Sequence, residues 1–155
     1  MLTKENLWVA GGEAISTHQI LTSGDGITWT GSTSGDLVFD GGECLTVAYN
    51  NLPGSDGLWV AGGQLATNDI AYSSDGVSWT GSSVFSGSNG ECDAVAHNGL
   101  INGGLWVAGG SGNNNTKLAY SSNGISWKGS TSGDEKLSGI CKTVASNRLA
   151  ALVET

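Results

Sequence analysis

The sequence predicts an all-β fold built from three copies of one antiparallel unit. Two observations carry this prediction: a set of words recurs at a regular spacing, and turn residues separate short apolar runs. The word LWVAGG begins at Leu7, Leu58 and Leu105. The cysteines, at Cys44, Cys92 and Cys141, mark a nearly constant period of roughly 48 residues, which is typical of stacked supersecondary units.

Each unit divides into four short strands, as antiparallel meanders do. Strand one is expected at Leu45–Asn50, Asp93–Asn98 and Lys142–Asn147, and strand two is the LWVA run. Strand three is expected at Ile20–Ser23, Ile70–Ser73 and Leu118–Ser121. Strand four is expected at Thr28–Thr30, Ser78–Thr80 and Ser126–Lys128. Four strands per unit at this period predict the blade of a β-propeller, with strands one and two near the centre. The chain is then one array over 1–155, with approximate units 1–42, 43–90 and 91–139 and a closing strand in 140–155.

The turn between strands three and four recurs as SGDGITW from Ser23, SSDGVSW from Ser73 and SSNGISW from Ser121. These segments resemble the Asp-box, or BNR, repeat of sialidase-like propellers, with one residue fewer between Asp and Gly than the commonest spelling. A short Asp or Asn side chain accepts backbone N–H groups in its own turn, and Gly takes the positive φ. The resemblance implies a structural role, away from the active face, for Asp25, Trp29, Asp75, Trp79, Asn123 and Trp127.

Charge excludes two classes of partner. The formal net charge is −8, and Arg148 is the one arginine of the sequence. Nucleic acids and anionic membranes both require clustered Lys and Arg, so neither is expected. No apolar run approaches the roughly 18 residues of a membrane-spanning helix, and the N-terminus shows no signal-peptide pattern. No compartment is indicated.

The cysteines occupy one repeat position, and symmetry places them too far apart for disulfides. We expect small buried hydrophobic side chains inside strands. A three-thiolate metal ring is the alternative, but it lacks a nearby His or a CxxC spacing. No metal or other cofactor is expected.

A non-enzymatic protein is favoured over an enzyme. Sialidases hold the substrate carboxylate with three arginines and use a Tyr–Glu pair, a set that one arginine cannot provide. A glycosidase needs two opposed carboxylates, and no motif accompanies the candidate acids Asp36, Asp40, Glu43 and Glu91. His18 and His97 have no Ser or Cys motif beside them. A glycoside-acting, sialidase-like enzyme remains the alternative function.

A repeat scaffold usually binds its ligand through the loops that vary between copies. These loops join strand two to three and strand four to the next unit, and they lie on one rim of a propeller. They carry amide, hydroxyl and carboxylate groups suited to sugar hydroxyls or Ca²⁺. The candidate binding residues are Gln64, Asn68, Asp69, Asn113, Asn114 and Asn115, with Ser88, Asn89, Glu13, Asp36 and Asp134 nearby. The other interpretation is solvated loops with no ligand.

Three blades leave an open arc, since complete propellers have four to eight. The strand at Lys142–Asn147 could complete the N-terminal blade of a second copy, and two copies would form a six-bladed C2 homodimer. The segment Leu149–Glu154 resembles a second strand that would compete with the partner's Leu7–Ala10, or that caps an edge. The expected partner is therefore the chain itself, and a glycan or another protein is the further possibility.

Overall fold

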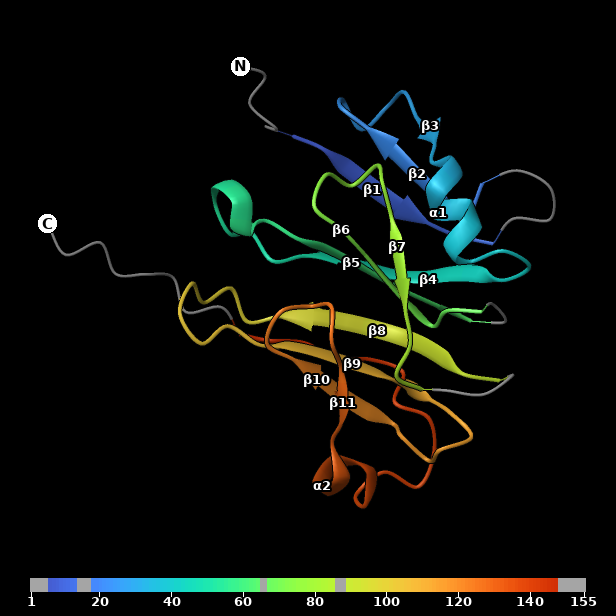
Figure 1. Cartoon of the computed structure of the whole chain (residues 1–155), viewed down its shortest axis with the longest axis vertical. Coiled ribbons are helices and arrows are strands. Elements are labelled where there is room, and N and C mark those ends of the chain that lie inside the picture. The colour runs from blue at the N-terminus through green and yellow to red at the C-terminus, as the bar shows by residue number, and fades with distance from the viewer. Residues whose placement is uncertain (1–5, 14–17, 65–66, 86–88, 148–155) are drawn as a thin grey trace, which may run out of the picture.

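The protein is described by a computed structural model over residues 6–13, 18–64, 67–85 and 89–147. It is all-β, and its curled antiparallel sheets form a half-barrel (Figure 1). Three repeat units, numbered 1 to 3 along the chain, follow one another from the blue end of the molecule to the orange end. The prediction of an all-β fold of short antiparallel strands is confirmed.

Unit 1 forms a three-stranded sheet in the order β1-β2-β3, and units 2 and 3 each have four strands in sequential order. Unit 1 contains β1 (Trp8–Gly11), β2 (Ile20–Ser23), β3 (Thr30–Gly31) and α1 (Thr33–Val38). Unit 2 contains β4 (Glu43–Tyr49), the 3-10 turn η1 (Gly54–Asp56), β5 (Trp59–Gln64), β6 (Ile70–Ser73) and β7 (Thr80–Ser82). Unit 3 contains β8 (Glu91–His97), β9 (Trp106–Ser111), β10 (Leu118–Ser121), β11 (Lys128–Gly129) and α2 (Thr131–Asp134).

Units 2 and 3 pair their first two strands in the same register. Tyr49 lies opposite Trp59, and His97 lies opposite Trp106. The register shifts once in each pair, just after the cysteine. A bulge at the same repeat position is a built-in feature of the unit. One residue pair, Gln64 with Glu91, joins the sheets of units 2 and 3.

The predicted strand boundaries need correction at strand four. In unit 2, β7 begins at Thr80 rather than Ser78. The same displacement separates β3 from the predicted Thr28–Thr30 and β11 from the predicted Ser126–Lys128. The cause is the preceding turn, where an Asp or Asn side chain binds the N–H groups and holds the backbone out of the sheet.

Two short helices, absent from the sequence-based prediction, follow the fourth strands of units 1 and 3. Ser32 caps α1 by accepting the Gly35 N–H, and Ser130 caps α2 by accepting the Gly133 N–H. Both helices come from the same word, GSTSGD, which begins at Gly31 and again at Gly129. The Ser at each N-cap is the sequence signal that identifies them.

The segment Lys142–Asn147, predicted as a strand one, has no strand pairing in the described part of the chain. A strand needs a neighbour to complete its ladder, and no described residue supplies one. The residue just before this segment nevertheless makes the same backbone hydrogen bond as its equivalent in unit 2. The Cys141 N–H donates to the Gly110 carbonyl at 3.1 Å, and the Cys44 N–H donates to the Gly12 carbonyl at 3.2 Å. The predicted second strand at Leu149–Glu154 lies outside the described residues.

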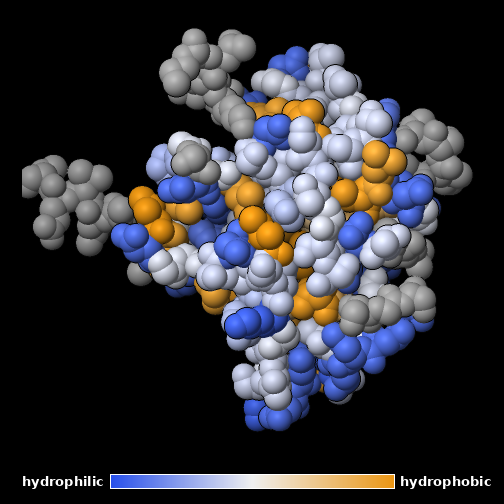
Figure 2. Space-filling model, viewed as in Figure 1, coloured by the Kyte–Doolittle hydropathy of each residue, from blue (hydrophilic) through white to orange (hydrophobic). Residues whose placement is uncertain are grey.

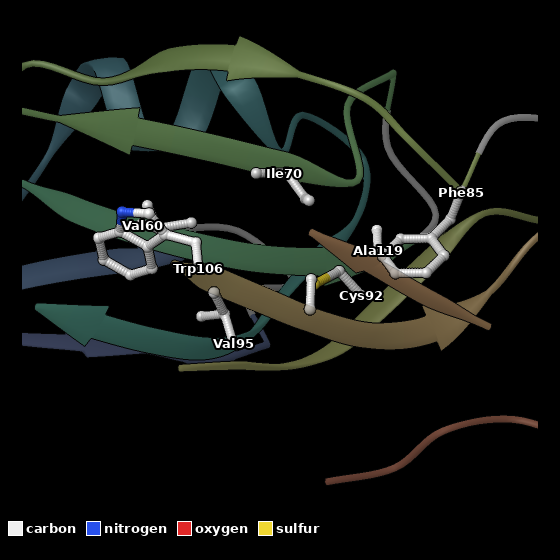
Figure 3. Packing of buried hydrophobic residues seen from close by; sticks show 8 residues of the cluster. Val60, Ile70, Phe85, Cys92, Val95, Trp106 and Ala119 are labelled. Carbon is white, nitrogen blue, oxygen red and sulfur yellow. The ribbon is translucent and has the colours of Figure 1, made fainter. Parts of the chain in front are cut away.

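The hydrophobic core lies between units. One cluster joins Ile20, Val38 and Phe39 of unit 1 to Cys44, Ala61, Ala71 and Trp79 of unit 2. The other joins Val60, Ile70 and Phe85 of unit 2 to Cys92, Val95, Trp106, Ala108 and Ala119 of unit 3 (Figure 3). Each unit therefore buries its apolar face on its neighbour, as in other repeat architectures.

The expectation that the cysteines are small buried side chains is confirmed for two of them. Cys44 and Cys92 are buried free thiols, while Cys141 is half-buried. Burial raises the pKa of Cys44 to about 12 and that of Cys92 well above its ordinary value. These two thiols are protonated packing groups at neutral pH.

Candidate functional site

The turns between strands three and four are held by their own Asp or Asn. We call the segments 23–29, 73–79 and 121–127 the Asx-Gly turns. In unit 2, Asp75 Oδ1 accepts the N–H groups of Val77 at 2.8 Å and Ser78 at 2.7 Å, and the Ser73 hydroxyl at 2.9 Å. Gly76 has φ 72°, a left-handed conformation that favours glycine. The local acceptor role predicted for these side chains is therefore present.

The same hydrogen bonds hold the two carboxyls ionised. The Thr28 and Ile27 N–H groups and the Ser23 hydroxyl lower the pKa of Asp25 to about 2. Burial opposes ionisation of Asp75, but the Ser78 and Val77 N–H groups outweigh it, and its pKa also falls to about 2. An acid with a pKa this low cannot act as a general acid near neutral pH.

The third turn has the same hydrogen bonds without a charged side chain. Asn123 Oδ1 accepts the Ile125 and Ser126 N–H groups at 2.9 Å each, and the Ser121 hydroxyl at 3.0 Å. This arrangement repeats that of Asp75 with an uncharged acceptor. The Asx-Gly turns are thus built as structural corners.

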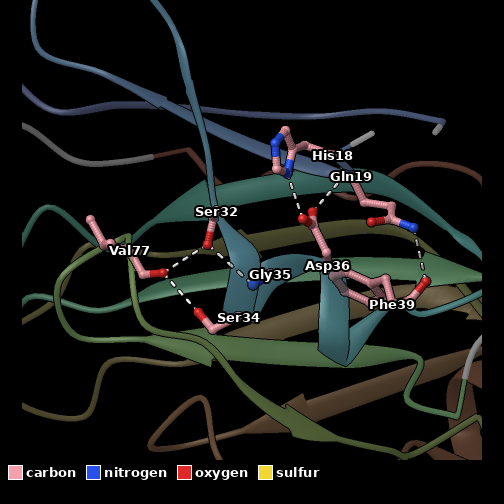
Figure 4. A network of polar contacts seen from close by, with 8 residues as sticks. All are labelled: His18, Gln19, Ser32, Ser34, Gly35, Asp36, Phe39 and Val77. Carbon is pink, nitrogen blue, oxygen red and sulfur yellow. Dashed lines mark hydrogen bonds and ion pairs between the residues drawn. The ribbon is translucent and has the colours of Figure 1, made fainter. Parts of the chain in front are cut away.

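In units 2 and 3 the Asx-Gly turn is clamped by the preceding unit, at a contact that we call a seam. At the first seam, between units 1 and 2, the hydroxyls of Ser32 and Ser34 donate to the Val77 carbonyl at 2.7 and 2.9 Å (Figure 4). Ser34 Oγ also accepts the Trp79 N–H at 3.0 Å. At the second seam, between units 2 and 3, the Ser82 hydroxyl donates to the Ile125 carbonyl at 3.0 Å.

The serines around α1 bind the Asx-Gly turn of unit 2, and the sequence motif of that turn does not predict them as its partners. They contact the Asx-Gly turn from a distant part of the chain, on the other side of the first seam. The available signal is the repeated GSTSGD word, which places identical serines after strand four in units 1 and 3. An acid of the same word, Asp36, orients the loop by accepting the Gln19 N–H at 3.0 Å and contacting the His18 ring (Figure 4).

Two of the predicted binding residues form hydrogen bonds across the seams, on the rim opposite to the Asx-Gly turns. The Asn68 side-chain amide donates to the Val38 carbonyl at 3.0 Å, across the first seam. The Asn114 amide donates to the Val84 carbonyl at 3.1 Å, across the second seam. Both donors lie in the loops that the sequence predicts for ligand recognition, and the structure places them between units.

The other four predicted binding residues are dispersed. Asp69 is buried and accepts the Val84 N–H at 2.8 Å, and burial raises its pKa despite this bond. Gln64 is the last residue of β5, and it pairs with the first strand of unit 2 and with the first strand of unit 3. Asn115 Oδ1 accepts from Lys117 Nζ at 2.9 Å, and Asn113 is exposed. Within the described residues, no shared pocket gathers these four side chains.

Close backbone contact completes each seam. Gly11 packs against Cys44 at the first seam and Gly62 against Cys92 at the second, each so closely that a Cβ on the glycine would collide with the cysteine Sγ. Gly109 packs in the same way against Cys141 of the segment that follows unit 3. The glycine of each Asx-Gly turn in units 2 and 3 is packed in the same way, since a Cβ at Gly124 would lie 2.5 Å from a methyl of Leu58. A Cβ at Gly76 would meet Leu7 at the same distance.

The two outer faces of the array lack these partners within the described residues. On unit 1, Ile27 is 84% exposed and Trp29 is 38% exposed, whereas the equivalent Trp79 is 6% exposed because unit 1 covers it. On unit 3, Leu105 is 37% exposed and Leu118 is half-buried. Figure 2 shows apolar residues in separate patches and hydrophilic residues gathered at the end that carries α2.

Cavities lie where the Asx-Gly turns meet the loops between strands one and two. A cavity of about 430 Å³ at the second seam is lined by Asn50, Leu58, His97, Leu100, Ile101, Trp106, Asn123 and Ile125, among others. A cavity of about 400 Å³ at the first seam uses the equivalent positions Leu7, Tyr49, Trp59 and Ser74. This rim is opposite to the one that the sequence predicts for binding. A smaller cavity on the predicted rim, about 350 Å³, is lined by Asn114, Asn115 and Asp134.

An aromatic pair stands at each of the two larger cavities. The ring centroids of Tyr49 and Trp59 are 4.7 Å apart, and those of His97 and Trp106 are 4.8 Å apart. His97 Nδ1 accepts the Gly99 N–H at 2.9 Å, so the neutral ring carries its proton on Nε2. Burial lowers the pKa of His97, against a raising contribution from the Asn50 backbone.

The candidate acids do not form an opposed pair around a cavity. Glu91 accepts the Ser111 hydroxyl at 3.2 Å and lies 3.5 Å from Lys142 Nζ, which also pairs with Asp93 at 2.9 Å. Asp36 is engaged with His18 and the Gln19 backbone. In the part of the chain that the structure describes, no group of three or more His, Cys, Asp or Glu side chains could hold a metal ion. The lone arginine, Arg148, lies outside the described residues.

Comparison with known proteins adds no relative: no family model, curated protein or solved structure matches the chain. None of the described helices is long and apolar enough to cross a membrane.

Proposed function

We propose that this protein is a non-enzymatic β-propeller module of the Asp-box type that assembles with copies of itself and serves as a structural or binding scaffold. The observation that supports this best is the repeated seam. Each internal seam joins an Asx-Gly turn to a serine donor of the preceding unit. Among the described residues, unit 1 presents a turn without such a donor, and unit 3 presents serines without a turn to bind.

The seams also explain what the polar loop residues do in this proposal. Asn68 and Asn114, one on each seam, bind a carbonyl of the neighbouring unit. The Asx-Gly turns hold their own backbones. Side chains that are hydrogen-bonded to the backbone in this way stabilise an array of units and are not available as catalytic groups.

Light scattering at micromolar concentration tests the assembly. A C2 dimer of the 15.7 kDa chain, with six units, is the expected species. A folded protein that stays at the monomer mass over this range would overturn the proposal. A fluorogenic glycoside panel, run on the same sample, addresses the sialidase-like alternative. Turnover that is lost on substituting one loop acid would establish the enzyme instead.

Carbohydrate binding is the second candidate function, and the 430 Å³ cavity is the observation that favours it. Its volume is typical of small-ligand sites. The exposed Leu100 and Ile101 offer apolar contact to a sugar ring, and His97 and Asn123 offer polar groups. A glycan array with the wild type and the Ile101→Asp variant tests it. Binding that is equal in both would exclude this cavity as the sugar site.

A further inference from the structure

We propose that the second copy docks head to tail in one defined register, with the segment 141–147 of one copy pairing with β1 of the next. This inference rests on the proposed self-assembly and gives it an atomic arrangement. We call the exposed side of unit 1 (Trp8, Gly26, Ile27, Trp29) the head face. The tail face is the exposed side of unit 3 (Leu105, Val107, Leu118, Ser130, Ser132).

The serines of the tail face match those of the first seam. Ser32 Oγ accepts the Gly35 N–H and still donates to the Val77 carbonyl. Ser130 Oγ likewise accepts the Gly133 N–H at 3.4 Å, and no described residue accepts its hydroxyl proton. The residue equivalent to Val77 in unit 1 is Ile27. The hydroxyls of Ser130 and Ser132 are therefore the donors for the Ile27 carbonyl of a second copy.

The apolar groups of the two faces are complementary by the same repeat relation. Trp79 packs in one cluster with Ile20, which is fully buried. The equivalents are Trp29 on the head face and Leu118 on the tail face, and both are partly exposed. Leu58 packs close to Gly124 at the second seam, so Leu105 takes the equivalent place against Gly26 of the second copy.

The segment 141–147 has the repeat position of a strand one, and we place it beside β1 of the second copy. Among the described residues, unit 1 has strands two to four. In units 2 and 3, Val47 lies opposite Ala61, and Val95 lies opposite Ala108. The equivalent intermolecular pair is Val144 opposite Ala10. In this register Ser146 lies opposite Trp8, as Tyr49 lies opposite Trp59.

Disulfide trapping between singly substituted chains tests the register. One variant carries Ala10→Cys and the other Val144→Cys, both with Cys141→Ala so that this half-buried thiol cannot react. Directly opposite residues approach to roughly 4.5–5.5 Å between Cα atoms, within the reach of a disulfide. A covalent dimer on a non-reducing gel is expected from the mixture and from neither variant alone. The matched control replaces Val144→Cys by Ala145→Cys, whose side chain points to the opposite face.

Serine variants provide a second readout that needs no oxidation. Ser132→Ala weakens self-association by about 25-fold to 100-fold, because the closed dimer has two identical interfaces and each loses one hydrogen bond worth about fivefold to tenfold. Thr131→Ala, at an exposed neighbour, leaves it unchanged. If light scattering shows a dimer but Ala145→Cys crosslinks as well as Val144→Cys, or Ser132→Ala associates normally, this docking arrangement is wrong while self-assembly stands. If no dimer forms, both fail.

Discussion

Gly11 packs against Cys44 across the first seam, so close that a Cβ on Gly11 would sit 2.3 Å from the cysteine Sγ and 3.1 Å from its carbonyl oxygen. The same contact recurs between Gly62 and Cys92. The LWVAGG word therefore contains glycine for a steric reason, because the first strand of the following unit crosses there. The contact also provides the most direct test of how the units pack.

Gly11→Ala should lower the free energy of unfolding by about 1–3 kcal/mol, the usual cost of overpacking. Gly12→Ala is the matched control, because a Cβ there meets nothing within 4 Å, and it should change stability by less than about 0.5 kcal/mol. Urea titration followed by Trp fluorescence measures both. Adding Cys44→Ala to Gly11→Ala should recover part of the loss, since the nearest remaining atom is then 3.0 Å away. Equal stabilities for the two glycine variants would contradict the seam geometry.

Asp75→Ala should destabilise the protein by about 1 kcal/mol, because it removes the acceptor of two backbone N–H groups. Asp75→Asn should cost much less, since Asn123 performs the same role in unit 3. Thermal unfolding at neutral pH measures the difference. An equal loss in both variants would mean that the negative charge, rather than the local acceptor, holds the turn.

The acid stability of the protein should depend on the same carboxyls. The pKa values of Asp25 and Asp75 fall from 3.8 to about 2 on folding. Below pH 3.8 the unfolded chain therefore binds protons that the folded chain does not, and stability is lost as the pH falls toward 2. The double substitution Asp25→Asn with Asp75→Asn should flatten this part of the pH profile of the unfolding free energy. An unchanged slope across this acid range would place the acid sensitivity elsewhere.

Ser34→Ala should lower stability by about 1–2 kcal/mol, because this hydroxyl donates to the Val77 carbonyl and accepts the Trp79 N–H. Thr33→Ala is the neighbouring control, since its side chain is exposed and Ala favours the helix. Hydrogen exchange at the Trp79 amide gives a local readout, with faster exchange expected only in Ser34→Ala. Unaltered protection of that amide would show that the clamp contributes nothing.

His97 should make the second seam weaker at mildly acidic pH. Burial lowers its pKa below the ordinary 6.5, so the unfolded chain takes up the proton first as the pH falls. Stability is therefore full above pH 6.5 and declines below it. His97→Tyr places there the residue that unit 2 has at Tyr49 and should remove this part of the decline. The unfolding free energies of the wild type and of His97→Tyr are measured from neutral to mildly acidic pH. Parallel profiles would show that His97 does not cause the decline.

The short-range features of this protein follow from its sequence because their physics is local. Asp25, Asp75 and Asn123 bind N–H groups two and three positions further along the chain, so one short word is enough to predict the turn. The strand order follows from the repeat of short apolar runs. Even the error at strand four is local, since the same side-chain bonds delay the start of the strand.

Tertiary structure alone decided what the repeated positions do. Trp29 and Trp79 occupy the same place in the word, yet Trp79 is buried and Trp29 is exposed, because only Trp79 has a described preceding unit against it. Asn68 and Asn114 are predicted from the sequence to bind a ligand, and in the structure they donate across seams. Burial and hydrogen bonding between units depend on which neighbour lies beside each copy. That neighbour comes from a distant part of the chain, beyond the range of any local pattern.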